Sequence, residues 1–556
     1  MKRIILVVAI CFFTPSLFGA ALDDLARDFW AWRAATMPDS FDDIPRLDRP
    51  AGWKPDWSAA AYARYHQDLD GFEARWKGID VSKEPIARQV DYRLMGSALA
   101  RVRWEMDIVR RWQRDPSFYI DQTMGVLFLD LLPPPPFTPE RSADIIRHLE
   151  AFPRILADGK ANLTDARRPF AEMALNELKD ARPRLLTVAR ELKPVLSADA
   201  AEKLQTATES AILALEDFRA WVQPRLPSMG KEIAVGRSNF EFFLKKVALI
   251  PYTPEQLVAM SRQEWERAAS FEAYEKNRNA GVPDLPIFPS ADAQIEREAK
   301  NEEAIRKFLG AKNILSVPAG VRHYRNRLVP AYVTPLSSLG VSDYLTGPDR
   351  LNDDAVSYIR PPSPNLSYFG LSTAKDPRPI IVHEGVPGHY FQKVMSWTDP
   401  DPIRRHYYDS SANEGIGFYA EEMMLQAGLW DDSPHSREII YNFMRLRAMR
   451  VEVAVRLATG QWTVAEGTKY LQTMVPMDEA TAHEDAAFYS STPGVGISYQ
   501  TGKLQILKML AEARQAKGDK FSLREFHDFV WRNGNVPLAM QRWELLGKTD
   551  ELDALK

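Results

Sequence analysis

Residues 380–392 read Ile-Ile-Val-His-Glu-Gly-Val-Pro-Gly-His-Tyr-Phe-Gln, an apolar stretch that carries two histidines and one glutamate. Zinc hydrolases often place two imidazole ligands around a carboxylate base with such a pattern. His383 and His389 are six residues apart, and a regular α-helix would separate them by about 120° around its axis and about 9 Å along it. Pro387 removes a backbone donor and Gly388 relaxes the dihedral limits. We therefore predict a bulge or widened turn that brings both imidazoles to one metal ion.

A catalytic zinc ion takes three protein ligands and keeps one position open, so the two histidines need a third partner. Glu414 is the first candidate, 25 residues after His389, in a segment that reads Asn-Glu-Gly-Ile-Gly-Phe-Tyr-Ala-Glu-Glu at 413–422. This separation allows one helix, a loop and a returning helix. Glu421 lies two helical turns farther along the same face. It is either the ligand in place of Glu414 or an acceptor that orients a histidine.

A third segment, residues 492–503, reads Thr-Pro-Gly-Val-Gly-Ile-Ser-Tyr-Gln-Thr-Gly-Lys. Its glycine-rich turn leads into a helix, and Tyr499 lies near the start of that helix. A phenol there can donate a hydrogen bond to the oxyanion that forms when water attacks a carbonyl. The alternative is a buried tyrosine bonded to a backbone carbonyl. His483, beside Glu484 and ten residues before the Pro-Gly turn, is a further candidate for a proton donor or oxyanion partner.

In order and spacing, three segments together resemble the bacterial family called domain of unknown function 885: His383–Gln392, Asn413–Glu422 and Pro493–Lys503. The resemblance extends over about residues 22–550. The family in turn resembles mostly helical zinc peptidases whose third ligand is a glutamate, among them the oligopeptidase and thermostable carboxypeptidase groups.

The resemblance implies that His383, His389 and Glu414 bind one zinc ion and that Tyr499 stabilises the transition state. The chain departs from the family pattern at three positions outside this metal site. Many relatives carry glutamine where this chain has Val495, and Asp and His where it has Ala454 and Ala458. These departures bear on substrate recognition and activity.

The N-terminus is typical of a secretory signal. Lys2 and Arg3 precede a short apolar run, and small residues end it near residue 20. We expect residues 1–20 to be cleaved, which would leave no stable membrane anchor and a periplasmic protein if the cell is Gram-negative. Cys11, the only cysteine, lies inside this segment and not next to the expected cut. The mature chain would then have no disulfide and no thiol chemistry.

Composition narrows the class of protein further. The chain has 556 residues, 45% of them hydrophobic and 26% charged, which is ordinary for a globular protein and excludes collagen-like or wholly disordered chains. With 71 Lys and Arg against 75 Asp and Glu, there is no basic excess to neutralise phosphates, so we expect no nucleic-acid partner. The sequence carries no sign of the oligomeric state.

Apolar residues at three- and four-residue steps predict a mainly α, large multi-helix fold. The resemblance implies that this fold is similar to that of the helical metallopeptidases, with a deep cleft. We expect an N-terminal helical region at 21–225 and a catalytic region at 226–556. Four prolines at 133–136 predict an extended connection. Thr164 has the character of a helix start. A small β element at 317–358 should precede the metal helix.

We expect the strands of this element, and the main helices, at the following residues: Ala331–Thr334 and Ala355–Ile359 as strands; Ala143–Leu156, Ala171–Leu192, Pro254–Asn277, Pro289–Gly310, Ala412–Leu429, Arg437–Ala458, Val464–Thr473 and Gly502–Gln515 as helices.

These residues predict a zinc-dependent peptide hydrolase acting on short peptides, in which Glu384 takes the proton of the attacking water. An extended substrate would add to the strand within Ala355–Tyr368. Arg360 could meet a substrate carboxylate, although a surface ion pair is the simpler reading. Two alternatives stay open: a catalytically impaired peptide-binding protein on the same scaffold, and a metal-dependent amidase or esterase acting on cell-envelope material.

Overall fold

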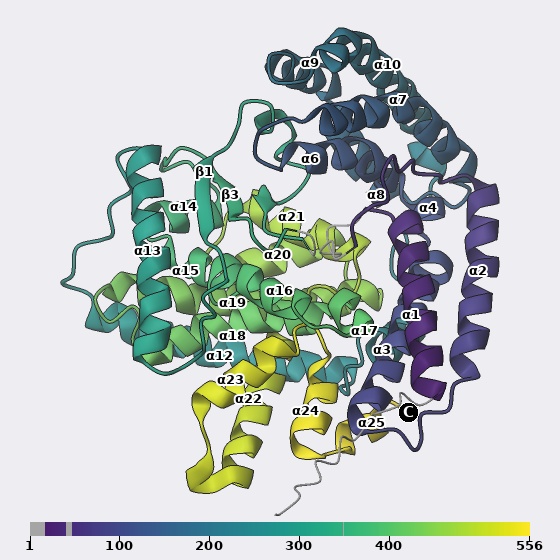
Figure 1. The fold of residues 1–556 in the computed structure, drawn as a ribbon. Helices are drawn as coiled ribbons and strands as arrows, with labels where there is room; N and C mark the ends of the chain where they lie inside the picture. The colour runs from purple at the N-terminus through teal and green to yellow at the C-terminus, as the bar shows by residue number, and fades with distance from the viewer. Residues whose placement is uncertain (1–16, 40–46, 348–349) are drawn as a thin grey trace, which may run out of the picture.

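The computed structural model describes residues 17–39, 47–347 and 350–556 (Figure 1). It is 69% helical and 3% strand, which confirms the mainly α, multi-helix fold. Most of the predicted signal segment, Cys11 included, lies outside the described residues. Within the described part, no helix has both the length and the apolar character needed to cross a membrane.

The first half of the chain forms an arc of helices along one side and over the top of the molecule, purple to blue in Figure 1. Helices α7 and α10 pack along each other within it. The arc contains α1 (Leu17–Thr36), α2 (Ala59–Lys77), α3 (Ile86–Arg103), η1 (Trp104–Val109), α4 (Arg111–Arg114), α5 (Pro116–Ile120), η2 (Asp121–Gly125), α6 (Val126–Leu131), α7 (Pro139–Asn162), α8 (Arg168–Leu178), α9 (Ala181–Leu192) and α10 (Ala198–Val222).

A middle section leads from the arc to a small sheet. It contains η3 (Gln223–Ser228), α11 (Arg237–Phe242), η4 (Phe243–Val247), α12 (Pro254–Arg278), α13 (Ala291–Ala311), β1 (Tyr324–Leu328), η5 (Thr334–Leu336), β2 (Asp343–Tyr344) and β3 (Ala355–Ile359). Thr253 and Gln256 close a capping box at the start of α12, which explains its sharp N-terminus.

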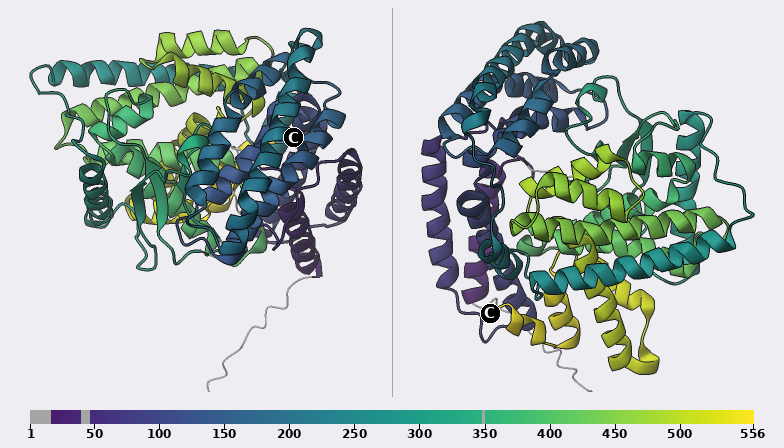
Figure 2. Two further views of the ribbon diagram at one scale, coloured as in Figure 1. Left: turned by 90° about the horizontal axis from the view of Figure 1, so that it is seen from above. Right: turned by 180° about the vertical axis from the view of Figure 1, so that it is seen from behind.

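The last section is helical again, and its α19 runs along α12 (Figure 2). It contains α14 (Tyr368–Lys375), α15 (Arg378–Ile380), η6 (Ile381–Gly385), α16 (His389–Trp397), α17 (Pro402–His406), α18 (Ser410–Ala427), α19 (Pro434–Ala458), α20 (Val464–Met474), α21 (Glu479–Ser491), α22 (Ser498–Lys517), η7 (Gly518–Lys520), α23 (Leu523–Arg532), α24 (Leu538–Leu546) and α25 (Asp550–Ala554).

Most predicted elements are confirmed, including the extended connection at 133–136 and the strand at Ala355–Ile359. Thr164 does not start a helix. It lies in a turn, and α8 begins only at Arg168, where a proline occupies the first turn. The carboxylate of Asp165, the residue after Thr164, pairs with Arg110 and Arg167. The stretch predicted as one helix at 171–192 is two helices, α8 and α9.

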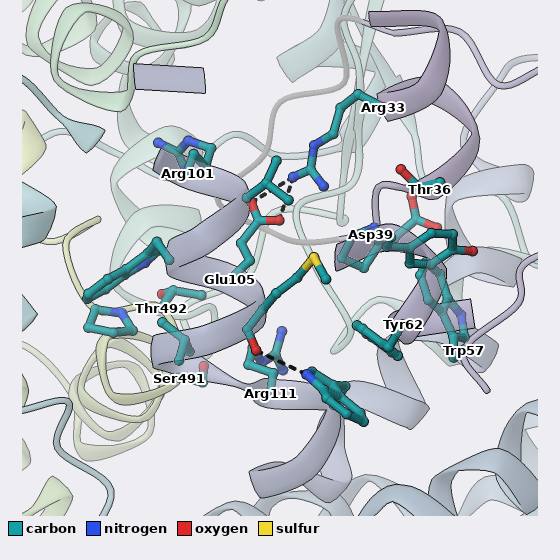
Figure 3. A pocket seen from close by; sticks show the side chains of 18 of the residues that line it. Arg33, Thr36, Asp39, Trp57, Tyr62, Arg101, Glu105, Arg111, Ser491 and Thr492 are labelled. Atoms are coloured by element: carbon teal, nitrogen blue, oxygen red, sulfur yellow. Dashed lines mark hydrogen bonds and ion pairs between the residues drawn. The ribbon is translucent and has the colours of Figure 1, made fainter. Parts of the chain in front are cut away.

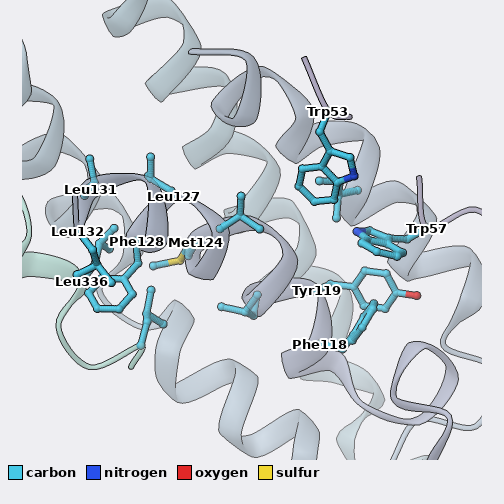
Figure 4. Close-up of a cluster of buried hydrophobic side chains, with 14 of the residues drawn as sticks. Trp53, Trp57, Phe118, Tyr119, Met124, Leu127, Phe128, Leu131, Leu132 and Leu336 are labelled. Atoms are coloured by element: carbon cyan, nitrogen blue, oxygen red, sulfur yellow. The ribbon is translucent and has the colours of Figure 1, made fainter. Parts of the chain in front are cut away.

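The predicted strand at Ala331–Thr334 is wrong. These residues form turns that lead into η5, with the amide of Thr334 bonded to the carbonyl of Pro330. The helical turns direct Val333 and Leu336 into the core of the N-terminal arc, where a strand would have placed only alternate residues. Figure 4 shows Leu336 beside Leu131 and Leu132 of that core.

The sheet has the order β1-β3-β2, with β1 parallel and β2 antiparallel to β3. Strand β3 is therefore central and has no free edge. The expectation that a peptide adds to the strand within Ala355–Tyr368 is wrong for this reason. The β2 edge is short, because it pairs only Asp343 and Tyr344 with β3.

Buried side chains hold the sheet to the arc and to the later helices. The hydroxyl of Tyr358 on β3 donates to the carbonyl of Leu132 at the end of α6, at 3.0 Å. On the other side, Tyr324 of β1 belongs to the apolar cluster that surrounds η6, α16 and α18. The sheet thus fixes the position of the segment that carries His383.

Glu298 of α13 lies at the contact between this helix and the sheet, where its side chain interacts with Asn326 of β1. Its side chain is 2% exposed and accepts a hydrogen bond from Gln294 at 2.9 Å. Removal from water raises the pKa of Glu298 to about 7, against the opposing hydrogen bond of Gln294. Since the folded pKa exceeds the unfolded one, this group's contribution to stability is complete below about pH 4.5 and is lost as the pH rises toward 7.

We expect Glu298→Gln to stabilise the protein at pH 8 by up to about 3 kcal/mol and to have a smaller effect at pH 5. Denaturant unfolding at both pH values measures the difference. Glu303→Gln, at an exposed position of the same helix, is the matched control and should show no such widening. A Glu298→Gln effect that is equal at both pH values would contradict the assignment.

Candidate metal centre

The helix that carries His383 is interrupted before it reaches His389. Residues Ile381–Gly385 form a π-helix, and α16 begins only at His389. A Cβ atom at Gly388 would overlap the carbonyl oxygen of His383, so only glycine fits this close return of the chain. The indole of Trp531 donates to the carbonyl of Pro387 at 2.6 Å and holds the connection from outside. The predicted widened turn is therefore present as the π-helix. After it the helix ends completely, and a new helix begins at His389.

The break places both imidazoles against one carboxylate. The Nε2 atoms of His383 and His389 lie 3.5 and 3.3 Å from Oε2 of Glu414, and the two ring centroids are 4.7 Å apart. Tetrahedral zinc with ligands at about 2.0–2.1 Å requires ligand atoms about 3.3–3.5 Å apart. Oε2 of Glu414 is buried and has no hydrogen-bond partner among the described residues. The distances from the two imidazole nitrogens to Oε2 of Glu414 match the spacing that zinc ligands require.

Glu384 is the other carboxylate near the two histidines. One ligand atom from each of His383, Glu384 and His389 lies within 4.8 Å of the others. Its Oε1 is 3.9 Å from Nε2 of His383, farther than Glu414, and its side chain is 26% exposed against 15% for Glu414. Glu414 is better placed than Glu384 to complete the donor set, because it is nearer to both imidazoles and more deeply buried. Glu384 then lies on the solvent side.

Glu421 contacts the opposite nitrogen of His383. Its Oε1 lies 2.8 Å from Nδ1 of His383 and 2.7 Å from Nη2 of Arg447 on α19. A carboxylate on Nδ1 leaves Nε2 as the atom that faces Glu414, and it fixes the orientation of the ring. Of the two roles that the sequence left open for Glu421, the geometry matches the orienting acceptor. Arg447 was not foreseen, since no local pattern marks it.

The backbone at Gly417 packs directly against the two imidazole rings. A Cβ atom there would lie 2.9 Å from Cε1 of His383 and 3.0 Å from Cε1 of His389. Gly417 is one turn after Glu414 on α18, so the helix backbone itself packs against both rings. Earlier on α18, Gly415 meets Gly502 of α22, and the two glycines let these helices cross at their backbones. This crossing carries Tyr499, one turn earlier on α22, to the metal centre.

The charges around the site favour a cation. Burial raises the pKa of Glu414, but the two imidazoles outweigh it and hold that pKa well below its usual range. Burial and Arg447 lower the pKa of His383, yet Glu414 and Glu421 raise it to about 9 overall. The carboxylates thus draw positive charge to the place where the three donor atoms meet.

Tyr499 faces this centre from the first turn of α22. Its ring is 6.4 Å from the ring of His383 and nearly parallel to it, at 15°. Removal from water and the charge of Glu414 raise the pKa of its phenol, so it stays protonated and able to donate. Arg450 of α19 also packs on this ring, with Cζ 4.9 Å from the ring centroid of Tyr499.

Asp343 of β2 is a further acid that sequence reasoning missed. Burial, together with the charge of Glu384, raises the pKa of Asp343 to about 7, while Ser357 and Lys393 oppose the shift. The sheet therefore brings one more carboxyl group within electrostatic reach of Glu384. Only the pairing of β2 with β3 creates this proximity, so the sequence around Asp343 carries no signal for it.

The remaining candidates lie apart from the donor atoms. His483 and Glu484 are exposed on α21, and no described contact joins His483 to the metal centre. Their neighbour Asp485 faces inward and pairs with Arg450. Arg360 is exposed beyond β3. His406, a histidine between the segments that carry His389 and Glu414, packs near Trp30 of α1, with ring centroids 6.1 Å apart.

A pocket lies between the N-terminal arc and the end of α21 (Figure 3). Its lining includes Trp57, Tyr62 and the ion pair of Arg33 with Glu105. None of the candidate metal ligands lines it. Ser491, Thr492 and Pro493 form one wall, so the pocket borders the turn that leads to Tyr499 but is separate from the metal centre.

Comparison with known proteins gives the family. The model of the family described as bacterial proteins of unknown function (DUF885) matches residues 47–545. The chain belongs to this family. No curated protein matches the chain.

Two solved structures share the fold of this DUF885 protein. One is described as a putative lipoprotein of unknown function from Shewanella oneidensis; it is 17% identical, with a TM-score of 0.70 over 96% of this chain and 100% of that chain. The other is described as the putative lipoprotein from Colwellia psychrerythraea; it is 18% identical, with a TM-score of 0.74 over 96% of this chain and 99% of that chain. At this identity they show the fold alone.

The structure gives a packing context for two departures from the DUF885 pattern. Ala454 is buried against the Pro-Gly turn, and a Cβ atom at Gly496 would lie 2.8 Å from the Cβ of Ala454. Val495 is buried in the same apolar cluster. Small and apolar side chains therefore fill the space behind the turn that positions Tyr499, and the metal donors are untouched.

Gly417→Ala should weaken zinc binding by about 10–100-fold without unfolding the protein, because the new methyl group displaces both imidazoles. Competition with a chromophoric chelator measures the affinity, and circular dichroism checks the fold. Gly71→Ala is the matched control, since a Cβ atom at Gly71 on α2 meets nothing within 4 Å. Unchanged zinc affinity in Gly417→Ala would contradict the placement of the site.

Proposed function

We propose that this DUF885 protein is an exported, zinc-dependent peptide hydrolase. One observation carries the proposal: two imidazole nitrogens lie 3.5 and 3.3 Å from the same carboxylate oxygen at a break in the helix, with a second carboxylate beside them. Three protein donors with one open position are typical of catalytic zinc, whereas structural zinc sites are closed by four.

His383, His389 and Glu414 would hold the ion. Bound zinc supplies a Lewis acid that polarises a carbonyl and lowers the pKa of a bound water to about 7. Glu421, with Oε1 2.8 Å from Nδ1 of His383, would favour the tautomer that carries its proton on Nδ1 and presents Nε2. Arg447 in turn pairs with Glu421 and balances its charge in the buried interior.

Glu384 would act as the general base. Its carboxylate borders the donor atoms without being the nearest of them, and it is the more exposed of the two acids. It would take the proton from the attacking water and pass it to the leaving amine. Tyr499 would donate its phenol hydrogen to the substrate oxygen as negative charge develops there. His483, exposed on α21, has no part in this scheme.

The geometry favours a peptide as the substrate. The edge strand β2 carries Asp343 within electrostatic reach of Glu384. An extended peptide that adds to this edge would run past the general base. An ester or simple amide needs no such edge, so these substrates are the alternatives that the assay below includes.

Export rests on the charged, apolar and small-residue pattern of residues 1–20. The two solved relatives are described as lipoproteins, which favours a place in the cell envelope and differs from the expected absence of an anchor. We therefore propose export, with the mode of attachment decided by experiment.

The metal claim predicts about one zinc per chain in the purified protein. His383→Ala and His389→Ala should each lose it, because two remaining donors hold zinc weakly. Elemental analysis of folded protein measures the metal. His527→Ala is the control, since His527 is buried outside the site and bonds Tyr419 and Ile314. Full zinc occupancy in both site variants would refute the ligand set.

Glu384→Gln and Tyr499→Phe should keep zinc and lose turnover, the second by about 100–1,000-fold. The assay is hydrolysis of mixed peptides, amides and esters, with and without chelator. Chelator-sensitive cleavage of esters or simple amides alone would replace peptidase by amidase or esterase. Absence of any chelator-sensitive turnover in the zinc-loaded protein would favour a peptide-binding protein.

Fractionation of cells that express the full chain tests the location. We expect a shortened chain in the envelope fraction. A soluble periplasmic chain would agree with complete cleavage, and membrane attachment abolished by Cys11→Ser would reveal a lipid anchor. A full-length chain in the cytoplasm would refute export.

A further inference from the structure

Arg450 is an enclosed cation beside the metal centre that the proposed chemistry leaves unused. It is 7% exposed. Its Nε and Nη2 atoms donate to the two oxygens of Asp485 on α21, at 2.9 and 3.0 Å. The remaining nitrogen, Nη1, takes no part in these two bonds and lies at the opposite edge of the guanidinium. One side of the guanidinium is thus held, and the other keeps its donors available.

Aromatic rings surround this guanidinium. Its Cζ atom lies 4.9 Å from the ring centroid of Tyr499, 5.7 Å from that of Phe369 and 5.9 Å from that of Tyr489. The rings attract the cation and keep water away from it. A hydrogen bond to a charged acceptor is stronger in such a place than in open solvent.

Helix α19 therefore offers two arginines, one turn apart, with different partners. Arg447 points to Glu421 and His383 and supports the metal ligands. Arg450 points to Tyr499, and the ring of Tyr499 in turn lies 6.4 Å from the ring of His383. Arg447 is therefore paired with a residue of the metal centre, whereas Arg450 faces Tyr499, the residue proposed to contact the substrate.

We infer that Arg450 is a specificity-determining residue that binds a carboxylate of the substrate peptide. The inference rests on the proposed function, because it places this carboxylate near the bond to be cut. Asp485 fixes one edge of the guanidinium, so the donors at the opposite edge are held in a rigid plane. Such planar donors match a carboxylate better than the single ammonium group of a lysine does.

The distances limit where this carboxylate can lie along the peptide. Arg450 is 4.9 Å from the ring of Tyr499, and that ring is 6.4 Å from the ring of His383. An extended chain advances about 3.3–3.6 Å per residue. The carboxylate therefore lies within about three residues of the scissile carbonyl. It is either the C-terminal carboxylate of a short peptide or an acidic side chain near the cut.

The test uses one N-acetylated pentapeptide containing a single glutamate, its C-terminal amide, and its glutamine analogue. We expect the wild-type protein to prefer the peptide that retains the recognised carboxylate by about 10–100-fold in kcat/KM. The arm that loses activity, amide or glutamine, identifies which carboxylate is bound. Arg450→Gln should abolish the preference by lowering turnover of the preferred peptide to that of its neutral analogue.

Binding separates this inference from the proposed function. Fluorescence anisotropy with labelled versions of the three peptides, on the Glu384→Gln protein with and without Arg450→Gln, should show the same preference without any hydrolysis. Arg450→Lys keeps the charge but not the planar fork, and we expect it to restore only part of the preference. Arg456→Gln is the matched control: it is also ion-paired on α19, to Glu452, but stacks on Trp462 away from the site.

Each outcome decides a separate claim. Preference for a carboxylate that disappears in Arg450→Gln, with zinc content unchanged, supports the inference. Equal binding and cleavage of all three peptides, or equal losses for all three in Arg450→Gln, would overturn it and leave the hydrolase proposal standing. A carboxylate preference in binding without turnover of any peptide would refute the hydrolase and keep the role of Arg450.

Discussion

The candidate site depends on how closely the backbone can approach itself at a few glycines. Gly388 lets the chain fold back onto the carbonyl of His383, and Gly417 lets α18 lie directly under both imidazole rings. At the crossing of α18 and α22, Gly415 and Gly502 meet backbone to backbone. A methyl group at any of these points would separate elements that must be in contact. The absence of side chains is thus as important here as the donors themselves.

The charges of the side chains around His383 then determine which kind of ligand the site can bind. Three carboxylates, Glu384, Glu414 and Glu421, lie around His383, and Arg447 pairs with one of them. Buried carboxylates are expensive unless a positive charge is near. A divalent cation at the meeting point of the donors would supply that charge, and it would explain why Oε2 of Glu414 is buried without a hydrogen bond.

The sequence predicts those features that depend on residues close together in the chain, such as periodic apolar positions and the spacing of two histidines. The helical stretches around Glu414 and Tyr499 were predictable from apolar spacing, and the awkward interval between His383 and His389 pointed to a break. Arg447 and Asp343 were not predictable, because their roles arise from contacts with segments far away in the chain. The central position of β3 was equally hidden, since strand order depends on pairing between segments and not on the pattern within one.

A buried ionic network keeps α22 in register with its neighbours, and through it the position of Tyr499. Lys503 is one turn after Tyr499 and is fully buried; its Nζ lies 2.6 Å from Glu422 of α18 and also contacts Glu264 of α12. Sliding α22 along α18 would leave the buried lysine unpaired, at a cost of about 3–5 kcal/mol. Glu422 and Glu264 would lose one of their two cationic partners and keep the other, Arg267 of α12. Because Glu422 and Glu414 belong to the same helix, the network that fixes Lys503 also fixes the phenol relative to the proposed zinc ligand.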